Sequence, residues 1–177
     1  NEIDTRSAPL TAFAPGDLVR VVSDRDRDFG VAYVNPATLI AARLLTRAPG
    51  AQIDEAWLAA RLRSAASLRA SVGVFEYGRM VYGESDELPG LVLDRYGDVL
   101  VGQIGTAGIE RLRPALEAAI RAVWAPRVLV WKNDSGAREL EGLPSFVEVA
   151  LGEAPEHAVV EENGVRFRVP LGAGQKT

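Results

Sequence analysis

The sequence predicts an α+β protein in which an incomplete small β-barrel is followed by a helix and a small α+β domain. Three observations predict this fold class. Residues 1–48 contain short β-branched runs separated by turn residues, a pattern typical of small barrels. Residues 54–72 carry apolar side chains at helical spacing. Residues 74–150 combine several short apolar runs with a second helical pattern.

The N-terminal segment is predicted to form strands at residues 18–22, 29–34 and 39–45. Pro15-Gly16-Asp17 predicts a turn before the first of them. The run DRDRD at residues 24–28 is too charged to be buried, so we expect an exposed loop or hairpin tip there. Because three strands cannot close a barrel, the barrel over residues 1–48 is expected to be incomplete.

A helix is predicted from Asp54, a suitable N-cap, to Val72, with Gly73 as its stop. Its apolar stripe comprises Trp57, Leu58, Leu62, Ala65, Leu68 and Val72. Arg61 falls within this stripe and Arg69 near its edge. A buried Arg requires a carboxylate, a phosphate or a route to water. We expect Arg61 to be buried against a carboxylate within residues 84–94; a nucleic-acid contact is the alternative.

The helix and a central α+β domain are assigned to residues 49–155. Apolar runs predict strands at residues 79–82, 91–94, 99–104 and 127–131. A further helix is predicted over residues 110–124, with a late start because Pro114 fits only its first turn. The run RVLVW at residues 127–131 is apolar enough to lie centrally in a sheet. Residues 156–177 are assigned to a hairpin and a following lead-in segment.

Composition excludes several kinds of site. The chain has no Cys, which excludes disulfides, thiolate metal sites and a Cys nucleophile within it. Its one His, His157, makes a His-based triad a poor expectation. No apolar run approaches the ~18 residues of a membrane span, so we expect a cytoplasmic protein without a membrane partner. The formal net charge is −4, yet residues 1–73 hold nine Arg against eight acidic residues.

Several clusters of polar residues could form a functional site, and each of them can also be explained as an ordinary loop, turn or surface. Glu84, Asp86 and Asp94 are clustered carboxylates that could perform acid/base work or bind a metal, yet turns favour the same residue types. Asn133 follows a buried strand, where sites tend to lie. The charged run after it, with Arg138 and Glu141, is typical of a solvated face. The C-terminal GQKT lacks the Gly-Lys pair of a nucleotide-phosphate loop.

Several segments together resemble the bacterial large-subunit ribosomal RNA cytosine-5 methyltransferases. They are GESDELPGLVLDRYGD at residues 83–98, WKNDSGARELEGL at residues 131–143 and ENGVRFRVPLGAGQKT at residues 162–177. The N-terminal runs PGDLVRVV and FGVAYVNP resemble the strands of that family's PUA domain. The resemblance implies a PUA-like barrel, a central α+β domain, and a Rossmann-like domain that binds S-adenosylmethionine and carries the catalytic Cys.

The resemblance further implies that this chain is a piece of such an enzyme, with the Rossmann-like methyltransferase domain missing. S-adenosylmethionine is the expected cofactor of the whole enzyme, and no cofactor is expected for this piece. Gln175 and Lys176 would lie at the edge of the cofactor site. No catalytic or metal-binding residue is expected within the chain. The expected function is recognition of ribosomal RNA by a fragment that is not catalytic alone.

RNA contacts are expected from Arg side chains to phosphate, with Tyr or Trp stacking on unpaired bases. The candidate residues are Arg20, Arg43, Arg47, Arg61, Arg63 and Arg69. Two alternatives stay open. The chain could be a scaffold or dimerisation unit, giving a homodimer in which these Arg residues pair internally. It could instead be a free-standing acidic hydrolase that uses Glu84, Asp86 and Asp94.

Overall fold

The structure is a computed structural model that describes residues 4, 9–74, 76–162 and 164–171. Its strands form three sheets, of three, five and two strands. The elements, in chain order, are η1 (Leu10–Ala12), β1 (Asp17–Val22), β2 (Asp28–Val34), β3 (Ala42–Thr46), α1 (Glu55–Ser71), β4 (Tyr77–Tyr82), η2 (Gly83–Asp86), β5 (Leu91–Tyr96), β6 (Val99–Ile104), α2 (Ala107–Arg111), α3 (Arg113–Trp124), β7 (Val128–Asn133), α4 (Ala137–Leu140), β8 (Phe146–Leu151), β9 (His157–Glu162) and β10 (Val165–Pro170).

The N-terminal sheet is an antiparallel meander in the order β1-β2-β3. Most of the charged run at residues 24–28 lies in the β1–β2 hairpin connection, as expected, with Asp26 in the left-handed region at φ 58°, while Asp28 begins β2. The third strand starts at Ala42 and not at residue 39. It starts late because Asn35 holds the intervening turn: its side chain accepts a hydrogen bond from the Ala37 amide, and Leu39 is fully exposed.

Helix α1 begins as predicted, because the Asp54 side chain accepts a hydrogen bond from the Trp57 amide. Only the first part of its predicted apolar stripe is buried. Leu58 and Leu62 are fully buried, whereas Leu68 and Val72 are exposed. The helix is therefore anchored in the core by Leu58, Leu62 and Ala65, while the last apolar residues of the stripe face solvent.

The central unit is a mixed five-stranded sheet in the order β4-β5-β6-β7-β8. Strands β6 and β7 are parallel and are joined by α2 and α3, while the other neighbours are antiparallel. Every residue of β7 is buried, which confirms its predicted central place. The predicted unit was smaller because it lacked β8, an edge strand in which the consecutive residues Val147, Glu148 and Val149 are all exposed.

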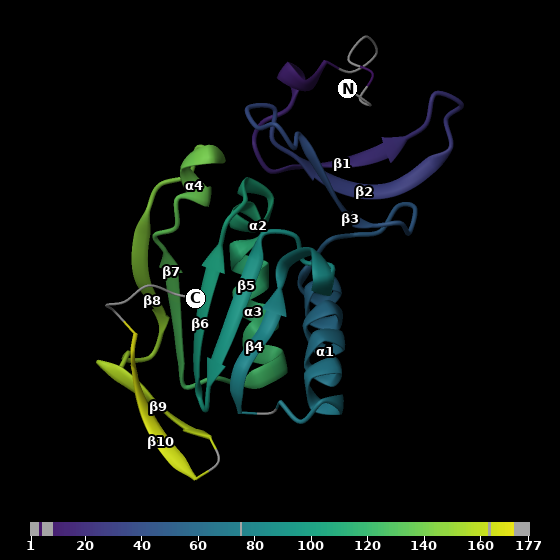
Figure 1. The fold of residues 1–177 in the computed structure, drawn as a ribbon. Coiled ribbons are helices and arrows are strands. Elements are labelled where there is room, and N and C mark those ends of the chain that lie inside the picture. The colour runs from purple at the N-terminus through teal and green to yellow at the C-terminus, as the bar shows by residue number, and fades with distance from the viewer. Residues whose placement is uncertain (1–3, 5–8, 75, 163, 172–177) are drawn as a thin grey trace.

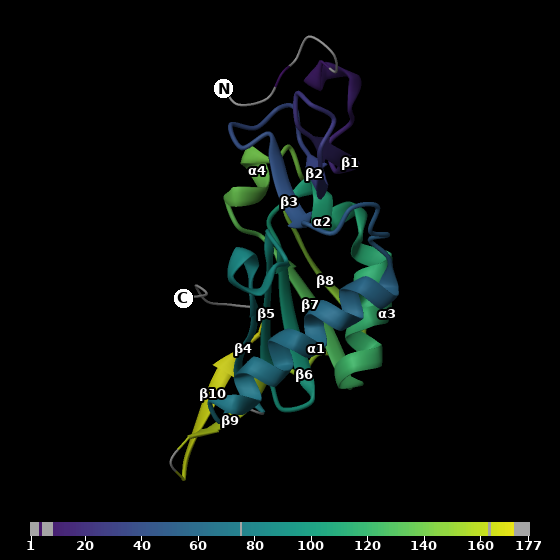
Figure 2. The ribbon, with the colours of Figure 1, turned by 90° about the vertical axis from the view of Figure 1, so that its right-hand side faces the viewer.

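Helices α1 and α3 lie side by side on one face of this sheet (Figure 2). The opposite face of β6 and β7 carries a second apolar cluster, which Ala158 and Leu171 cover. The three-stranded sheet lies beyond one end of the five-stranded sheet, and the β9–β10 hairpin lies at the other end (Figure 1). Within the described part of the chain, no helix is long and apolar enough to cross a membrane.

Candidate functional site

Strand β2 joins the N-terminal sheet to the central domain through the buried side chain of Tyr33. Its hydroxyl lies 3.1 Å from both the Pro89 carbonyl oxygen and the Thr106 hydroxyl. Burial raises the pKa of the Tyr33 phenol well above its ordinary value, so the group stays neutral. A Cβ at Gly108 would overlap the Tyr33 ring. The close approach of β2 to α2 therefore requires glycine at this position.

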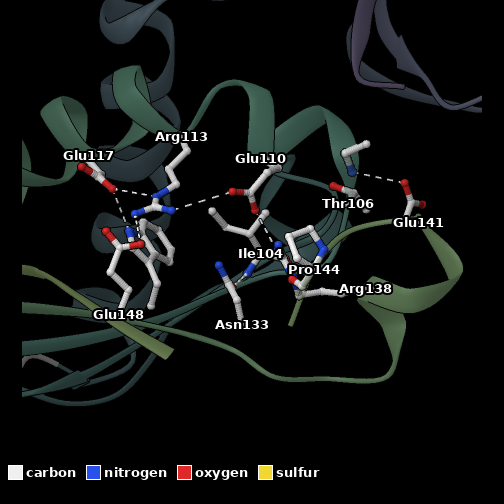
Figure 3. Close-up of polar contacts among 12 residues, drawn as sticks. Ile104, Thr106, Glu110, Arg113, Glu117, Asn133, Arg138, Glu141, Pro144 and Glu148 are labelled. Carbon is white, nitrogen blue, oxygen red and sulfur yellow. Dashed lines mark hydrogen bonds and ion pairs between the residues drawn. The ribbon is translucent and has the colours of Figure 1, made fainter. Parts of the chain in front are cut away.

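A second buried contact joins the two parts through Glu141, just after α4. Asn35 Nδ2 donates a hydrogen bond to Glu141 Oε2 at 2.8 Å. The Ala107 amide donates to the same oxygen at 3.2 Å, as Figure 3 shows beside Thr106. Arg43 Nη2 lies 3.4 Å from Glu141 Oε1. Glu141 is buried and not on a solvated face as its charged surroundings suggested, because three groups distant in sequence share its charge.

Two adjoining cavities open along this junction, and Glu84 lines both. The larger has a volume of about 490 Å³ and the smaller about 250 Å³. Arg43 lines the larger cavity, and Arg47 and Arg61 line the smaller. We refer to the two together as the junction cavities. They bring three of the six predicted RNA-binding Arg residues to one boundary.

The other three predicted Arg residues lie apart from these cavities. Arg20 is exposed on β1 and lies 3.9 Å from Asp28. Arg63 is exposed on α1 without a carboxylate partner among the described residues. Arg69 forms a two-pronged ion pair with Asp86, with N–O distances of 2.5 and 2.6 Å. Arg69 is thus a structural residue in this conformation, since its guanidinium is already engaged.

The prediction for Arg61 was correct about its partner and wrong about burial. Arg61 pairs with Glu87, inside the expected range of carboxylates, and its guanidinium lies over the Trp57 ring. Its side chain nevertheless retains 32% of its exposure. The buried pair is Arg69–Asp86, with side-chain exposures of 15% and 3%. Helical spacing alone cannot distinguish these two positions, because η2 folds back over α1 only in the tertiary structure.

The three carboxylates of the hydrolase alternative do not form one shared site. Asp86 pairs with Arg69, and Asp94 pairs with Arg79 at 2.9 Å. The hydrogen bond that Arg79 donates to the Asp94 carboxylate raises the pKa of Arg79. Glu84 is exposed beside Arg43. In the residues that the structure describes, no group of three His, Cys, Asp or Glu side chains could hold a metal ion. The geometry gives the hydrolase alternative no support.

The loops at the carboxyl ends of the parallel strands are held by two side chains (Figure 3). Asn133 Oδ1 accepts a hydrogen bond from the Ile104 amide at 2.7 Å. Arg138 Nη1 donates to the Ile104 carbonyl at 2.6 Å and contacts Glu110 at 2.7 Å. Arg138 is fully buried, against our expectation of a solvated face. The local sequence did not reveal this, since Ile104 and Glu110, which both contact Arg138, lie on β6 and α2.

The N-terminal residues match a known domain family, and the fold as a whole is similar to solved structures of methyltransferases. A family model described as a PUA-like domain matches residues 1–47. The five-stranded unit, together with the N-terminal sheet, is similar in fold to solved methyltransferase structures. A putative SAM-dependent methyltransferase from Streptococcus mutans aligns over 91% of this chain and 42% of its own, with a TM-score of 0.74 and 20% identity. A putative methyltransferase complexed with SAH aligns over 92% and 41%, also with a TM-score of 0.74 and 20% identity.

Curated proteins that are similar in sequence carry a more specific name. Ribosomal RNA large subunit methyltransferase I of Cronobacter sakazakii is 34% identical over 93% of this chain and 42% of its own length. The enzyme of the same name from Pseudoalteromonas atlantica is 31% identical over 92% of this chain and 42% of its own. The chain thus spans about two fifths of the curated relatives it matches, and these relatives are ribosomal RNA methyltransferases.

The structural match corrects the predicted fold class. We expected an incomplete barrel, a helix and a small α+β domain, with the Rossmann-like methyltransferase domain missing. The observed mixed five-stranded sheet and its helices instead align with SAM-dependent methyltransferase structures over about two fifths of their length. That expectation rested on the family resemblance, and the predicted strands had not been assembled into a mixed sheet with β8 and the parallel pair β6 and β7.

The described residues do not by themselves suggest where a cofactor would bind. Gln175 and Lys176, expected at the edge of that site, lie outside the described residues. The loops after the parallel strands β6 and β7 are Gly105-Thr106 and Asp134-Ser135-Gly136, and neither has the glycine pattern of a dinucleotide loop. We therefore derive no chemical step through S-adenosylmethionine.

Proposed function

We propose that these residues form the RNA-binding part of an S-adenosylmethionine-dependent methyltransferase that modifies C5 of a cytosine in ribosomal RNA. The observation that carries the proposal is the convergence of Arg43, Arg47 and Arg61 on the junction cavities. The similarity to ribosomal RNA methyltransferases supports the substrate. The PUA-like match supports a recognition role for the N-terminal residues. We divide the chain functionally as 1–48, 49–155 and 156–177.

In this proposal the Arg side chains contact RNA phosphates. These contacts do not distinguish one RNA base sequence from another, so the bases are recognised by other groups. Arg47 is exposed and has no carboxylate partner in the described part of the chain, so it is free to bind phosphate. Arg61 retains partial exposure beside an exposed Glu87, and such a surface pair contributes little and is readily exchanged. Arg43 is more buried and also supports the junction. Arg20 and Arg63 would make peripheral contacts.

The test measures how RNA affinity depends on salt for the full chain. A labelled ribosomal RNA hairpin with a single-stranded loop is titrated at two salt concentrations. Three or four phosphate contacts predict a log–log slope near about −2 to −3. Arg47→Glu should weaken binding for every loop sequence alike and make the slope shallower by about 0.7. Arg121→Glu, on α3 away from the junction cavities, is the matched control and should leave affinity nearly unchanged.

A second candidate, a scaffold or dimerisation unit, is favoured by one specific observation. Four of the six predicted Arg residues already have carboxylate partners, namely Arg20, Arg43, Arg61 and Arg69. An absence of hairpin binding at low salt, or equal binding by the wild type and Arg47→Glu, would favour this candidate over RNA recognition. A concentration-dependent molar mass in light scattering would then identify a homodimer.

A further inference from the structure

We propose that the larger junction cavity binds one unpaired nucleobase of the RNA, stacked on Tyr82 and hydrogen-bonded by Gln103. This inference rests on the proposed RNA-binding function and adds a base-reading site to it. The cavity, about 490 Å³, falls within the size range of small-molecule sites. It lies where the open face of the five-stranded sheet meets the N-terminal sheet. Its walls combine apolar and hydrogen-bonding groups.

The base of the cavity is a row of three side chains across adjacent strands. Tyr82 of β4 pairs with Val92 of β5, and Val92 pairs with Gln103 of β6. Leu91 and Leu93 belong to the core beneath the helices, so Val92 between them points to the opposite face. Tyr82, Val92 and Gln103 all line the cavity. A flat base could lie across this row.

Tyr82 provides an aromatic surface at the edge of the sheet. Tyr82 is 55% exposed, more than Tyr33, Tyr77 or Tyr96. The Arg79 guanidinium lies 5.3 Å from the ring centroid, a cation–π contact on one side of the ring. Exposed aromatic rings on sheet faces commonly stack unpaired bases, and stacking accepts any base. Tyr82 therefore supplies binding energy with little sequence preference.

Hydrogen-bonding groups line the wall formed by the carboxyl ends of β6 and β7. Within the described residues, the Gln103 amide and the Ser135 hydroxyl have no hydrogen-bond partner. The loops that carry Gly105 and Ser135 are fixed through the hydrogen bonds of Ile104 (Figure 3). Ligands of α/β sheets bind at this end of parallel strands. An amide that can both donate and accept is suited to a base edge.

Charge separates this cavity from a larger one elsewhere in the described structure. That cavity, about 1160 Å³, lies between the β9–β10 hairpin and the ends of β4 and β5. It is lined by Glu76, Glu161 and Glu162 but by Arg168 alone among basic residues, so it would repel a phosphate chain. The proposed base site instead adjoins Arg47 and Arg61 through the smaller junction cavity. The RNA backbone and its base thus have neighbouring sites.

The test compares two hairpins of equal charge with the full chain. One has a normal single-stranded loop of ribosomal RNA, and the other has abasic nucleotides at every loop position. The ratio of the two affinities isolates the contribution of bases from that of phosphates. We expect the wild type to favour the normal loop on the order of tenfold, as one stacked base provides. Tyr82→Ala and Gln103→Ala should reduce this preference, while Tyr82→Phe should retain most of it.

Tyr77→Ala is the matched control, since Tyr77 lies on the same strand but lines the other cavity. It should keep the full preference. If the wild type binds both hairpins equally, or if Tyr82→Ala and Gln103→Ala keep the preference, the base site is wrong and the proposed RNA-binding function stands. If the wild type binds neither hairpin, both proposals fail. Circular dichroism of each variant verifies folding, which these partly exposed positions should tolerate.

Discussion

Arg61 and Arg69 are on the same helix and pair with neighbouring acids, yet the burial of the acid separates their roles. Asp86 is almost fully buried, and besides Arg69 it accepts a hydrogen bond from the Tyr82 amide at 2.6 Å. Glu87 has a side-chain exposure of 62%. Removing the cation from a buried pair leaves a charge without compensation, whereas an exposed acid is returned to water. Replacing each Arg in turn therefore tests how burial of the paired acid affects the free energy of unfolding.

Arg69→Ala should lower the free energy of unfolding by about 3–5 kcal/mol, because Asp86 would remain buried and unpaired. Arg61→Ala should lower it by no more than about 1 kcal/mol, as expected of an exposed pair. Urea unfolding followed by circular dichroism measures both values. Equal losses in the two variants would show that burial of the acid does not decide the contribution.

At the scale of elements, Glu84 in η2 and Glu87 just after it contact two different parts of the chain. Glu84 faces Arg43 of β3 at 3.7 Å, and Glu87 faces Arg61 of α1. Both acids are exposed and line the junction cavities. An incoming phosphate would have to displace these carboxylates from the guanidinium groups. In the proposed RNA-binding function, this segment would therefore weaken phosphate binding while it orients the Arg side chains.

Replacing these acids should strengthen RNA binding. Glu84→Gln and Glu87→Gln each remove a competing charge, and an exposed ion pair of up to about 1 kcal/mol corresponds to an increase in affinity of about 2- to 5-fold. Fluorescence anisotropy with the labelled hairpin measures the dissociation constants. Glu153→Gln, an exposed acid remote from both junction cavities, controls for net charge. The same gain in that control would refute competition by η2.

At the scale of the molecule, the N-terminal sheet and the central domain are joined by buried polar contacts from β2. Tyr33 contacts Pro89 and Thr106, and Asn35 contacts Glu141. Desolvation raises the pKa of Tyr33 in the folded state. The folded protein therefore keeps a proton that the unfolded chain releases above about pH 10. The contribution of Tyr33 to the free energy of unfolding is fully present below that pH. It decreases as the pH rises towards the pKa of Tyr33 in the folded state.

We expect the wild type to lose stability more steeply than Tyr33→Phe between about pH 9.5 and 11. At about pH 8 the variant should be less stable by about 0.5–1.5 kcal/mol, since the hydroxyl loses its hydrogen bonds. Urea unfolding across this pH range measures the difference. Tyr96, whose pKa burial also raises, is present in both proteins and cancels. If the difference in the free energy of unfolding between the two proteins stayed constant with pH, Tyr33 would ionise as easily in the folded state as in the unfolded chain.

Local features of this protein could be predicted from the sequence because their causes lie within a few residues. The Asp54 cap, the strand β6 and the late helix start at Pro114 all follow from neighbouring residues. The PUA-like character of the first residues was also recognisable, since it rests on short consecutive motifs. The convergence of the Arg residues and the identity of the buried pair were not predictable in this way.

Only the tertiary structure decided which charges are buried and which face solvent. Glu141 and Arg138 lie in a charged run that is typical of a surface, yet both are buried. One partner of Glu141 is Asn35, separated from it by 106 residues, and Arg138 contacts Ile104 and Glu110. A charge is stable in the interior only where distant groups compensate it. Local sequence therefore determined most elements of this protein, and the packing of those elements decided β8 and the arrangement of the candidate site.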